Sequence, residues 1–193
     1  MADAGNLQLG RILRSTALLL AVCSMPMMLA VKAWGQAGEY QVKAAYLYQF
    51  LNFVFWPDSA FTAADSPYEI CVLGRDPFAG DLENSVRGKQ VRGRPVRVQR
   101  LSTASSARRC HILFIADSER TRLGLILEAV RGLPLLTVSE LRDFELQGGM
   151  VRFVMEHDMV RLRINPDASG AAGVAISSKL LAVATVVRGG GGV

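Results

Sequence analysis

The sequence predicts an α/β domain with a mostly parallel sheet, helices on both faces of that sheet and an antiparallel hairpin near the C-terminus. Continuous apolar runs, such as residues 68–74 and 111–116, alternate with segments that have helical spacing, which is typical of β-α-β crossovers. Two alternating runs, 151–155 and 160–164, are separated by only four residues, which predicts the hairpin. A chain of 193 residues, half of them hydrophobic, suffices for a leader and one such domain.

The first half of the domain begins with the most aromatic stretch of the chain. Apolar residues recur at helical spacing across residues 40–55, which predicts an amphipathic helix that Pro57 ends. A small polar loop then leads to the buried strand at 68–74. Asp76 stands before a proline and is expected to cap a short helix that ends near Gly88.

The second half continues the alternation of strands and helices. The strand at 111–116 precedes a helix that Asp117 or Ser118 is expected to cap. The strand at 135–138 precedes a helical turn that Ser139 is expected to cap. These crossovers place the strands in a parallel sheet.

The C-terminal end of the domain is predicted to be helical. Ser177 or Ser178 is expected to cap a last helix that runs through Val187. Glycines dominate residues 189–193, which predicts a disordered tail and sets the domain at 38–188.

Residues 1–37 have the pattern of a cleaved signal peptide. Arg11 and Arg14 precede an apolar run at 16–31, and small residues that suit a cleavage site follow. A membrane anchor needs about 20 apolar residues, which this run does not reach, so cleavage is favoured over retention. A lipoprotein signal ending at Cys23 is a weaker alternative, because a bulky valine precedes the cysteine. The sequence therefore predicts an exported, periplasmic protein.

The charge of the domain does not favour nucleic-acid binding. The leader holds three basic residues and one acidic residue, so its removal lowers the formal net charge from +5 to +3. A charge of this size, in an exported protein, does not indicate nucleic acid as a partner.

Two cysteines remain after removal of the leader. Cys71 and Cys110 each begin a strand-like apolar run and would enter an oxidising compartment. If the two runs are neighbouring strands, the cysteines could form a disulfide worth about 4 kcal/mol in the chain-entropy model. Two buried thiols are the alternative.

Basic residues concentrate in one segment, residues 87–109, which holds eight of them. An anion-binding site is one interpretation of this segment. The other, which we favour, is a strand with one solvated face, because Val96 and Val98 alternate with Arg97 and Gln99.

The sequence lacks the patterns of an active site, a metal site or a phosphate-binding loop. Its two histidines, His111 and His157, have no metal-ligand spacing with cysteine or with each other. Ser178 and Lys179 are adjacent and would not face each other on a helix. We therefore expect no enzymatic activity, no cofactor and no metal.

Several motifs, in this order, resemble the YfiR family across nearly all of the domain. They are EYQVKAAYLYQFLNFVFWP at 39–57, ICVLG at 70–74 with DPF at 76–78, CHILFI at 110–115, LTVS at 136–139, GGM at 148–150 and ISSKLL at 176–181. The resemblance implies an exported α/β domain with a disulfide between Cys71 and Cys110. It offers no counterpart here for the second cysteine pair of some members. Phe55 also departs from the polar residue common at its position.

The resemblance also implies a function. Proteins of this kind repress an inner-membrane diguanylate cyclase of the YfiN type and are released by an outer-membrane lipoprotein of the YfiB type. We therefore expect a non-enzymatic regulator that lowers cyclic-di-GMP output and biofilm formation; a homodimer is left open. The residues expected to contact the partner are Phe53, Phe55, Trp56, Arg161 and Arg163.

A small-molecule-binding sensor domain, serving a sensor kinase or a receptor, is the alternative. Open α/β sheets bind ligands beyond the carboxyl ends of their strands. Arg75, Asp117 and Ser139 follow three predicted strands, so they are the expected residues of a ligand crevice.

Overall fold

The computed structural model describes the backbone of residues 25–188 and the side chains of residues 38–188. By its contacts the chain divides into two compact units, Met1–Gly38 and Glu39–Val193, and the description below concerns the second. Most of the predicted leader and the whole of the predicted tail at 189–193 lie outside the described residues. The limits of leader, domain and tail stay predictions.

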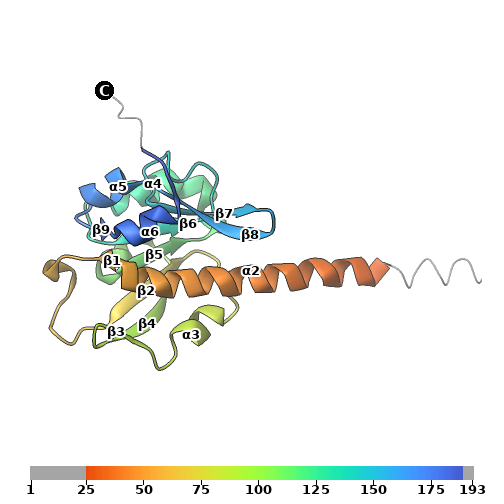
Figure 1. Ribbon diagram of the computed structural model, residues 1–193, viewed down its shortest axis with the longest axis horizontal. Helices are drawn as coiled ribbons and strands as arrows, with labels where there is room; N and C mark the ends of the chain where they lie inside the picture. Colours follow the sequence, from red (N-terminus) through yellow and green to blue (C-terminus); the bar gives the residue numbers. More distant parts are fainter. Residues whose placement is uncertain (1–24, 189–193) are drawn as a thin grey trace, which may run out of the picture. The chain divides into compact units, whose positions relative to one another are not determined.

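One sheet of eight strands forms the centre of the described unit (Figure 1). Its strands are β2 (Tyr68–Leu73), β3 (Gln90–Val91), β4 (Arg94–Leu101), β5 (Ile112–Ile115), β6 (Leu136–Ser139), β7 (Val151–Glu156), β8 (Met159–Ile164) and β10 (Thr185–Val186). They lie in the order β10-β8-β7-β6-β5-β2-β4-β3. The pairs β3–β4 and β7–β8 are antiparallel, and the other five pairs are parallel. The predicted fold class is confirmed.

Helices cover both faces of the sheet. The helices are α2 (Met25–Phe53), α3 (Asp81–Val86), α4 (Leu123–Ala129), α5 (Pro166–Ala171) and α6 (Ser178–Ala182), with 3-10 turns η1 (Asp58–Ala60), η2 (Ala104–Arg109) and η3 (Asp117–Arg122). Along β2, Ile70 and Val72 join one hydrophobic core with α2, α3 and α6, whereas Leu73 joins a second core with α4. This alternation follows from the period of two along a strand.

The aromatic helix begins earlier than predicted, at Met25, and ends two residues before the predicted end. α2 ends at Phe53, and the next two residues form β1 (Val54–Phe55), which pairs antiparallel with β9 (Ala175–Ile176). The guanidinium of Arg92 donates hydrogen bonds to the carbonyl oxygens of Asn52 and Val54 at 3.2 and 3.3 Å. These long-range partners satisfy the backbone that another helical turn would have used.

The helix predicted from Asp76 begins later, at Asp81. Gly80, at φ 97°, stands directly before it, in a backbone conformation that suits glycine. Asp76 instead accepts a hydrogen bond from the Phe78 N–H at 2.8 Å and pairs with Arg100. It therefore stabilises the turn before α3 and is not the helix cap.

The C-terminal helix is shorter than predicted. The Ser177 side chain caps α6 by accepting from the Leu180 N–H at 3.3 Å, as expected. The helix ends at Ala182, however, because Thr185 and Val186 leave it to pair with β8 as β10. The predicted hairpin is confirmed, and His157 and Asp158 form its two-residue turn with positive φ at both positions.

Candidate functional site

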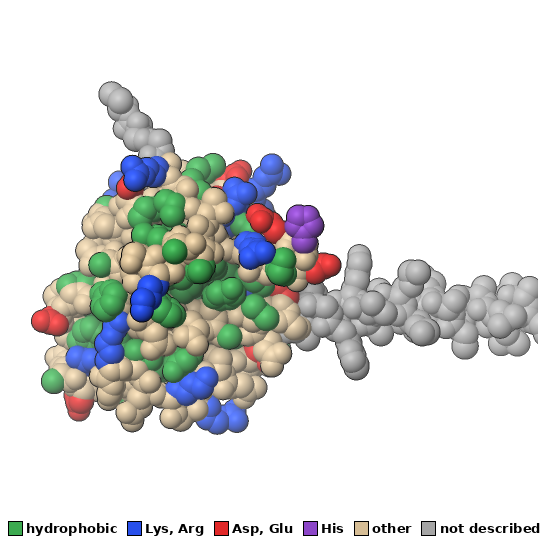
Figure 2. Space-filling model, viewed as in Figure 1, with side chains coloured by type: hydrophobic (Ala, Val, Ile, Leu, Met, Phe, Trp, Pro, Cys, Tyr) green, Lys and Arg blue, Asp and Glu red, His purple; other side chains and the backbone are tan. Residues whose placement is uncertain are grey.

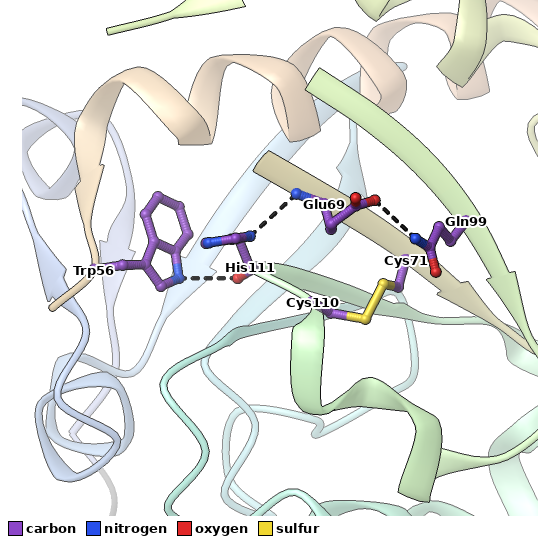
Figure 3. The surroundings of a disulfide bond; sticks show 6 residues. All are labelled: Trp56, Glu69, Cys71, Gln99, Cys110 and His111. Carbon is purple, nitrogen blue, oxygen red and sulfur yellow. Dashed lines mark hydrogen bonds between the residues drawn. A yellow bond between two sulfur atoms is a disulfide. The ribbon is translucent and has the colours of Figure 1, made fainter. Parts of the chain in front are cut away.

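The disulfide joins β2 to the segment directly before β5 (Figure 3). Cys71 and Cys110 are bonded, with their Cα atoms 5.9 Å apart. β2 and β5 are neighbouring strands, with Cys71 opposite Leu113. The prediction of a bridge is confirmed for this pair, and the alternative of two free buried thiols is excluded.

His111, the residue after Cys110, lies in an aromatic cluster at the start of β5. Its ring packs against Phe61, Tyr68 and Trp56, with centroids 4.5, 5.1 and 5.8 Å away. Its Nδ1 accepts a hydrogen bond from the Glu69 N–H at 3.1 Å. Burial, together with the charge of Arg94, lowers the pKa of His111 to about 4, so the ring is neutral at physiological pH.

The three aromatic residues expected to contact a partner lie in different environments. Trp56 is buried, and its indole Nε1 donates to the His111 carbonyl oxygen at 3.0 Å (Figure 3). Phe55 is 50% exposed and lies under the Arg92 guanidinium, which is 4.5 Å from the ring centroid. Phe53 is half-buried. Of these three aromatic residues, only Phe55 and Phe53 therefore offer surface to a partner.

Phe53 lines an apolar groove between α2 and α6, which we call the α2–α6 groove. The groove has a volume of about 330 Å³ and is lined by Tyr46, Gln49, Phe50, Phe53, Lys179, Leu180 and Val183. Val183 is 70% exposed. In the space-filling view, hydrophobic side chains gather over the region of α2 and α6, with basic side chains among them (Figure 2).

Arg161 and Arg163 both lie on β8 and alternate with buried residues, as predicted. Arg161 is exposed, whereas Arg163 lies 3.9 Å from Glu145 and 3.8 Å from Glu156. Two exposed methionines, Met155 and Met159, are on the same hairpin.

The three predicted crevice residues lie at or just after the carboxyl ends of the neighbouring strands β2, β5 and β6, but their side chains lie in different environments. Ser139 is fully buried, and its hydroxyl donates to the Ile115 carbonyl at 2.7 Å and accepts from the Leu141 N–H. Arg75 is exposed, and its backbone N–H donates to the Ser118 hydroxyl. Neither Asp117 nor Ser118 caps an α-helix, since the 3-10 turn η3 precedes α4.

Asp117 does line a crevice beyond the carboxyl ends of the parallel strands, which we call the Lys43 crevice. It has a volume of about 410 Å³ and is lined by Glu39, Lys43, Asp117, Glu140, Arg142, Arg152, Phe153, Val154 and Met155. The Lys43 ammonium is buried and pairs with both Glu39 and Glu140. The Arg152 guanidinium is buried against Glu145, with Nε 2.9 Å from Oε2, an ion pair whose geometry does not form a hydrogen bond.

Tyr40 completes the polar network of the crevice. Its hydroxyl donates to Glu140 Oε1 at 2.7 Å. Burial and this hydrogen bond raise the pKa of the Tyr40 phenol well above its usual value. The sequence prediction missed Lys43 and Arg152, although charged residues at otherwise apolar helix and strand positions were a signal for them.

The described residues offer no metal centre, since no three His, Cys, Asp or Glu side chains among them lie close enough to share an ion. The helices in this part of the chain fall short of the length or hydropathy of a membrane span.

The model of the YfiR/HmsC-like family matches residues 40–185. No curated protein matches the chain. One solved structure with a similar backbone is a conserved domain protein from Vibrio cholerae O1 biovar El Tor, at 12% identity and a TM-score of 0.48. The match covers 61% of this chain and 54% of that one, so the chain spans about half the length of that structure.

YfiR/HmsC-like proteins are periplasmic, non-catalytic regulators of diguanylate cyclase systems. The match takes in the aromatic helix, both cysteines and the hairpin, and extends over most of the described domain. The chain belongs to the YfiR/HmsC-like family.

Proposed function

We propose that the protein is an exported, non-enzymatic regulator that binds and represses an inner-membrane diguanylate cyclase of the YfiN type. Repression lowers the output of cyclic-di-GMP, and an outer-membrane lipoprotein of the YfiB type is the proposed releasing partner. The match to the family across residues 40–185 carries the proposal. The expected export signal fits a partner with a periplasmic sensor region.

The α2–α6 groove and Phe55 form the proposed contact surface. Phe55 and Val183 are 50% and 70% exposed, and the groove between α2 and α6 has almost entirely apolar walls. Burying such a surface against a partner supplies the hydrophobic free energy of association. The β7–β8 hairpin, with Met155, Met159 and Arg161, offers a second surface of mixed apolar and basic character.

Repression requires that the regulator distinguish two states of its partner. A ligand shifts a two-state equilibrium only by its difference in affinity for the two states. The regulator must therefore bind the inactive cyclase more tightly than the active one. Substitutions that weaken binding should raise cyclase output even though they lie far from any catalytic centre.

The test is cyclic-di-GMP measured in cells that lack the gene and in cells complemented with variants. We expect the level to rise on deletion, to fall with the wild-type gene and to stay high with Phe55→Asp or Val183→Asp. Leu125→Asp is the matched control, because Leu125 is 75% exposed on α4, which packs on the other face of the sheet. It should repress like the wild type.

Two outcomes would contradict the proposal in different ways. An unchanged cyclic-di-GMP level on deletion would exclude the cyclase as the partner. Full repression by Phe55→Asp and Val183→Asp, at equal periplasmic abundance, would exclude the surface formed by the α2–α6 groove and Phe55 as the contact surface.

The second candidate is a small-molecule sensor domain that serves a sensor kinase or a receptor. The Lys43 crevice favours it, because it lies at the end of the sheet where α/β folds bind ligands. A thermal-shift screen with nucleotides and amino acids tests this function. A flat response across both classes would count against it.

A further inference from the structure

A second pocket lies at the opposite end of the sheet, where β2 and β5 begin; we call it the His111 pocket. It has a volume of about 320 Å³, in the range of small-molecule sites. Its polar walls include Glu69, Arg97, Arg108, Arg109 and His111. We propose that the His111 pocket binds a small organic anion, held by the three arginines and by Nε2 of His111.

The three arginines have no carboxylate partner within the described residues. Arg97, Arg108 and Arg109 form no salt bridge among these residues. By contrast, Arg100, three residues after Arg97 on β4, pairs with both Asp76 and Glu83. Arg97 comes from β4, and the other two come from the end of η2. Guanidinium groups from two separate elements thus converge on one pocket, which suits a carboxylate or a phosphate.

His111 supplies an unused hydrogen-bond donor. Because Nδ1 accepts from the Glu69 N–H, the proton of the neutral ring must be on Nε2. The His111 side chain is only 3% exposed, and its Nε2 has no hydrogen-bond partner in the described structure. A buried donor without an acceptor is costly. An anion that entered the pocket and displaced the atoms covering Nε2 would supply the missing acceptor.

Glu69 is the single carboxylate in the wall, and its charge is partly compensated. Gln99 Nε2 donates to Glu69 Oε2 at 3.1 Å. Burial raises the pKa of Glu69, against the lowering effects of Arg97 and of this hydrogen bond. Three guanidinium groups against one carboxylate leave the pocket with an excess of positive charge.

The loop between η1 and β2 closes the other side of the pocket with Phe61, Thr62, Ser66 and Pro67. Arg94 fixes this loop, since its guanidinium lies 4.0 Å from the Phe61 ring centroid and donates to the carbonyl oxygens of Ala63 and Ser66. An aromatic wall beside two hydroxyl groups suits a ligand with a small apolar body attached to its anionic group.

The disulfide joins two segments that contribute residues to the pocket wall. Cys110 is between Arg109 and His111 in the chain, and Cys71 is two residues after Glu69 on β2. The bridge therefore holds the two sides of the pocket in a fixed relation.

The experiment titrates the purified, oxidised chain with phenyl phosphate and with benzoate, and follows the histidine side chains by NMR and the affinity by calorimetry. The two probes share the ring and differ in the anion, so they distinguish a phosphate site from a carboxylate site. We expect at least one to bind one-to-one and to shift the Nε2 resonance of His111. Arg97→Gln and Arg109→Gln should each weaken it about tenfold or more.

Two controls make the result decisive. Arg131→Gln removes an exposed arginine outside the pocket and should leave the affinity unchanged. His111→Asn keeps an acceptor near the Nδ1 position and removes Nε2, so it should weaken binding; near-ultraviolet circular dichroism checks the aromatic cluster. Saturable binding of neither probe overturns the proposal. The proposal is also overturned if the arginine variants bind more weakly but the His111 resonance does not shift. That result would indicate anion binding to a basic surface and not in the His111 pocket. Neither result bears on the regulation of a cyclase.

Discussion

Both ends of the sheet hold basic side chains, but among the described residues those at one end are paired with carboxylates and those at the other end are not. In the Lys43 crevice, Lys43 is paired with Glu39 and Glu140, and Arg152 is paired with Glu145. In the His111 pocket, the described structure gives none of the three arginines a salt bridge and leaves Nε2 of His111 without an acceptor. Charges that already satisfy one another stabilise a structure, whereas unpaired charges around a pocket can recruit a ligand.

This difference changes where a ligand is expected. The fold rule for open α/β sheets favours the carboxyl ends of the strands, which is the Lys43 crevice. A ligand there would compete with carboxylates that are already bound to Lys43 and Arg152. At the amino ends of the strands a ligand would meet hydrogen-bond donors that have no partner in the described part of the chain. The unpaired charges therefore favour a ligand in the His111 pocket, although the fold rule favours the opposite end of the sheet.

Removal of the disulfide should have the largest effect on stability. The Cys71→Ala, Cys110→Ala double variant is expected to lose about 4 kcal/mol in free energy of unfolding, because the bridge closes a long loop in the unfolded chain. Urea denaturation of the variant and of the wild type measures the loss. Hydrogen exchange should rise first around Glu69 and His111. An equal rise around Lys43 would show that the two ends are not independent.

Arg152→Met should cost about 3 kcal/mol, because it leaves the fully buried Glu145 carboxylate with only a distant partner, Arg163 at 3.9 Å. Arg142→Met is the matched control, since Arg142 also lines the crevice but its side chain is 87% exposed. It should change stability by less than about 0.5 kcal/mol. Similar losses for the two variants in thermal unfolding would contradict a structural role for the buried pair.

His111 should make stability depend on pH at the other end of the sheet. Its pKa is lowered to about 4 in the folded protein from an ordinary value of 6.5, so the unfolded chain binds the extra proton first as pH falls. The free energy of unfolding should therefore decrease between pH 6.5 and 4 by about 2–3 kcal/mol.

His111→Asn should lack that slope while keeping the contribution of Glu69, whose raised pKa acts in the opposite direction near its own titration. Urea denaturation of both proteins across this pH range provides the comparison. Parallel curves would show that His111 titrates normally.

Local patterns predicted much of the fold, because they act over short distances in the chain. The apolar run at 68–74 formed β2, and the four-residue gap after Met155 formed a hairpin with its turn at His157 and Asp158. The disulfide was predictable because removal of the expected leader would leave Cys71 and Cys110 as the cysteines of the domain.

Pairings between distant residues were not predictable in this way. Val54 and Phe55 left the helix for a strand whose partner, β9, lies more than 100 residues later. Lys43 pairs with Glu140 across a similar separation in the sequence. Helical periodicity predicts neither contact. The unused Nε2 of His111 depends on the Glu69 N–H that occupies Nδ1, so it becomes visible only once β2 and β5 are side by side.

Arg97→Gln should have the smallest effect on stability, and that small effect separates the two ends most clearly. Arg97 is exposed and has no salt bridge in the described structure, so its loss should change the free energy of unfolding by less than about 0.5 kcal/mol. Urea denaturation measures this, and the same sample tests anion binding. A loss as large as that of Arg152→Met would mean that Arg97 belongs to a structural network like that of the crevice. Unchanged stability with weakened anion binding would show that Arg97 contributes to ligand binding and not to the stability of the fold.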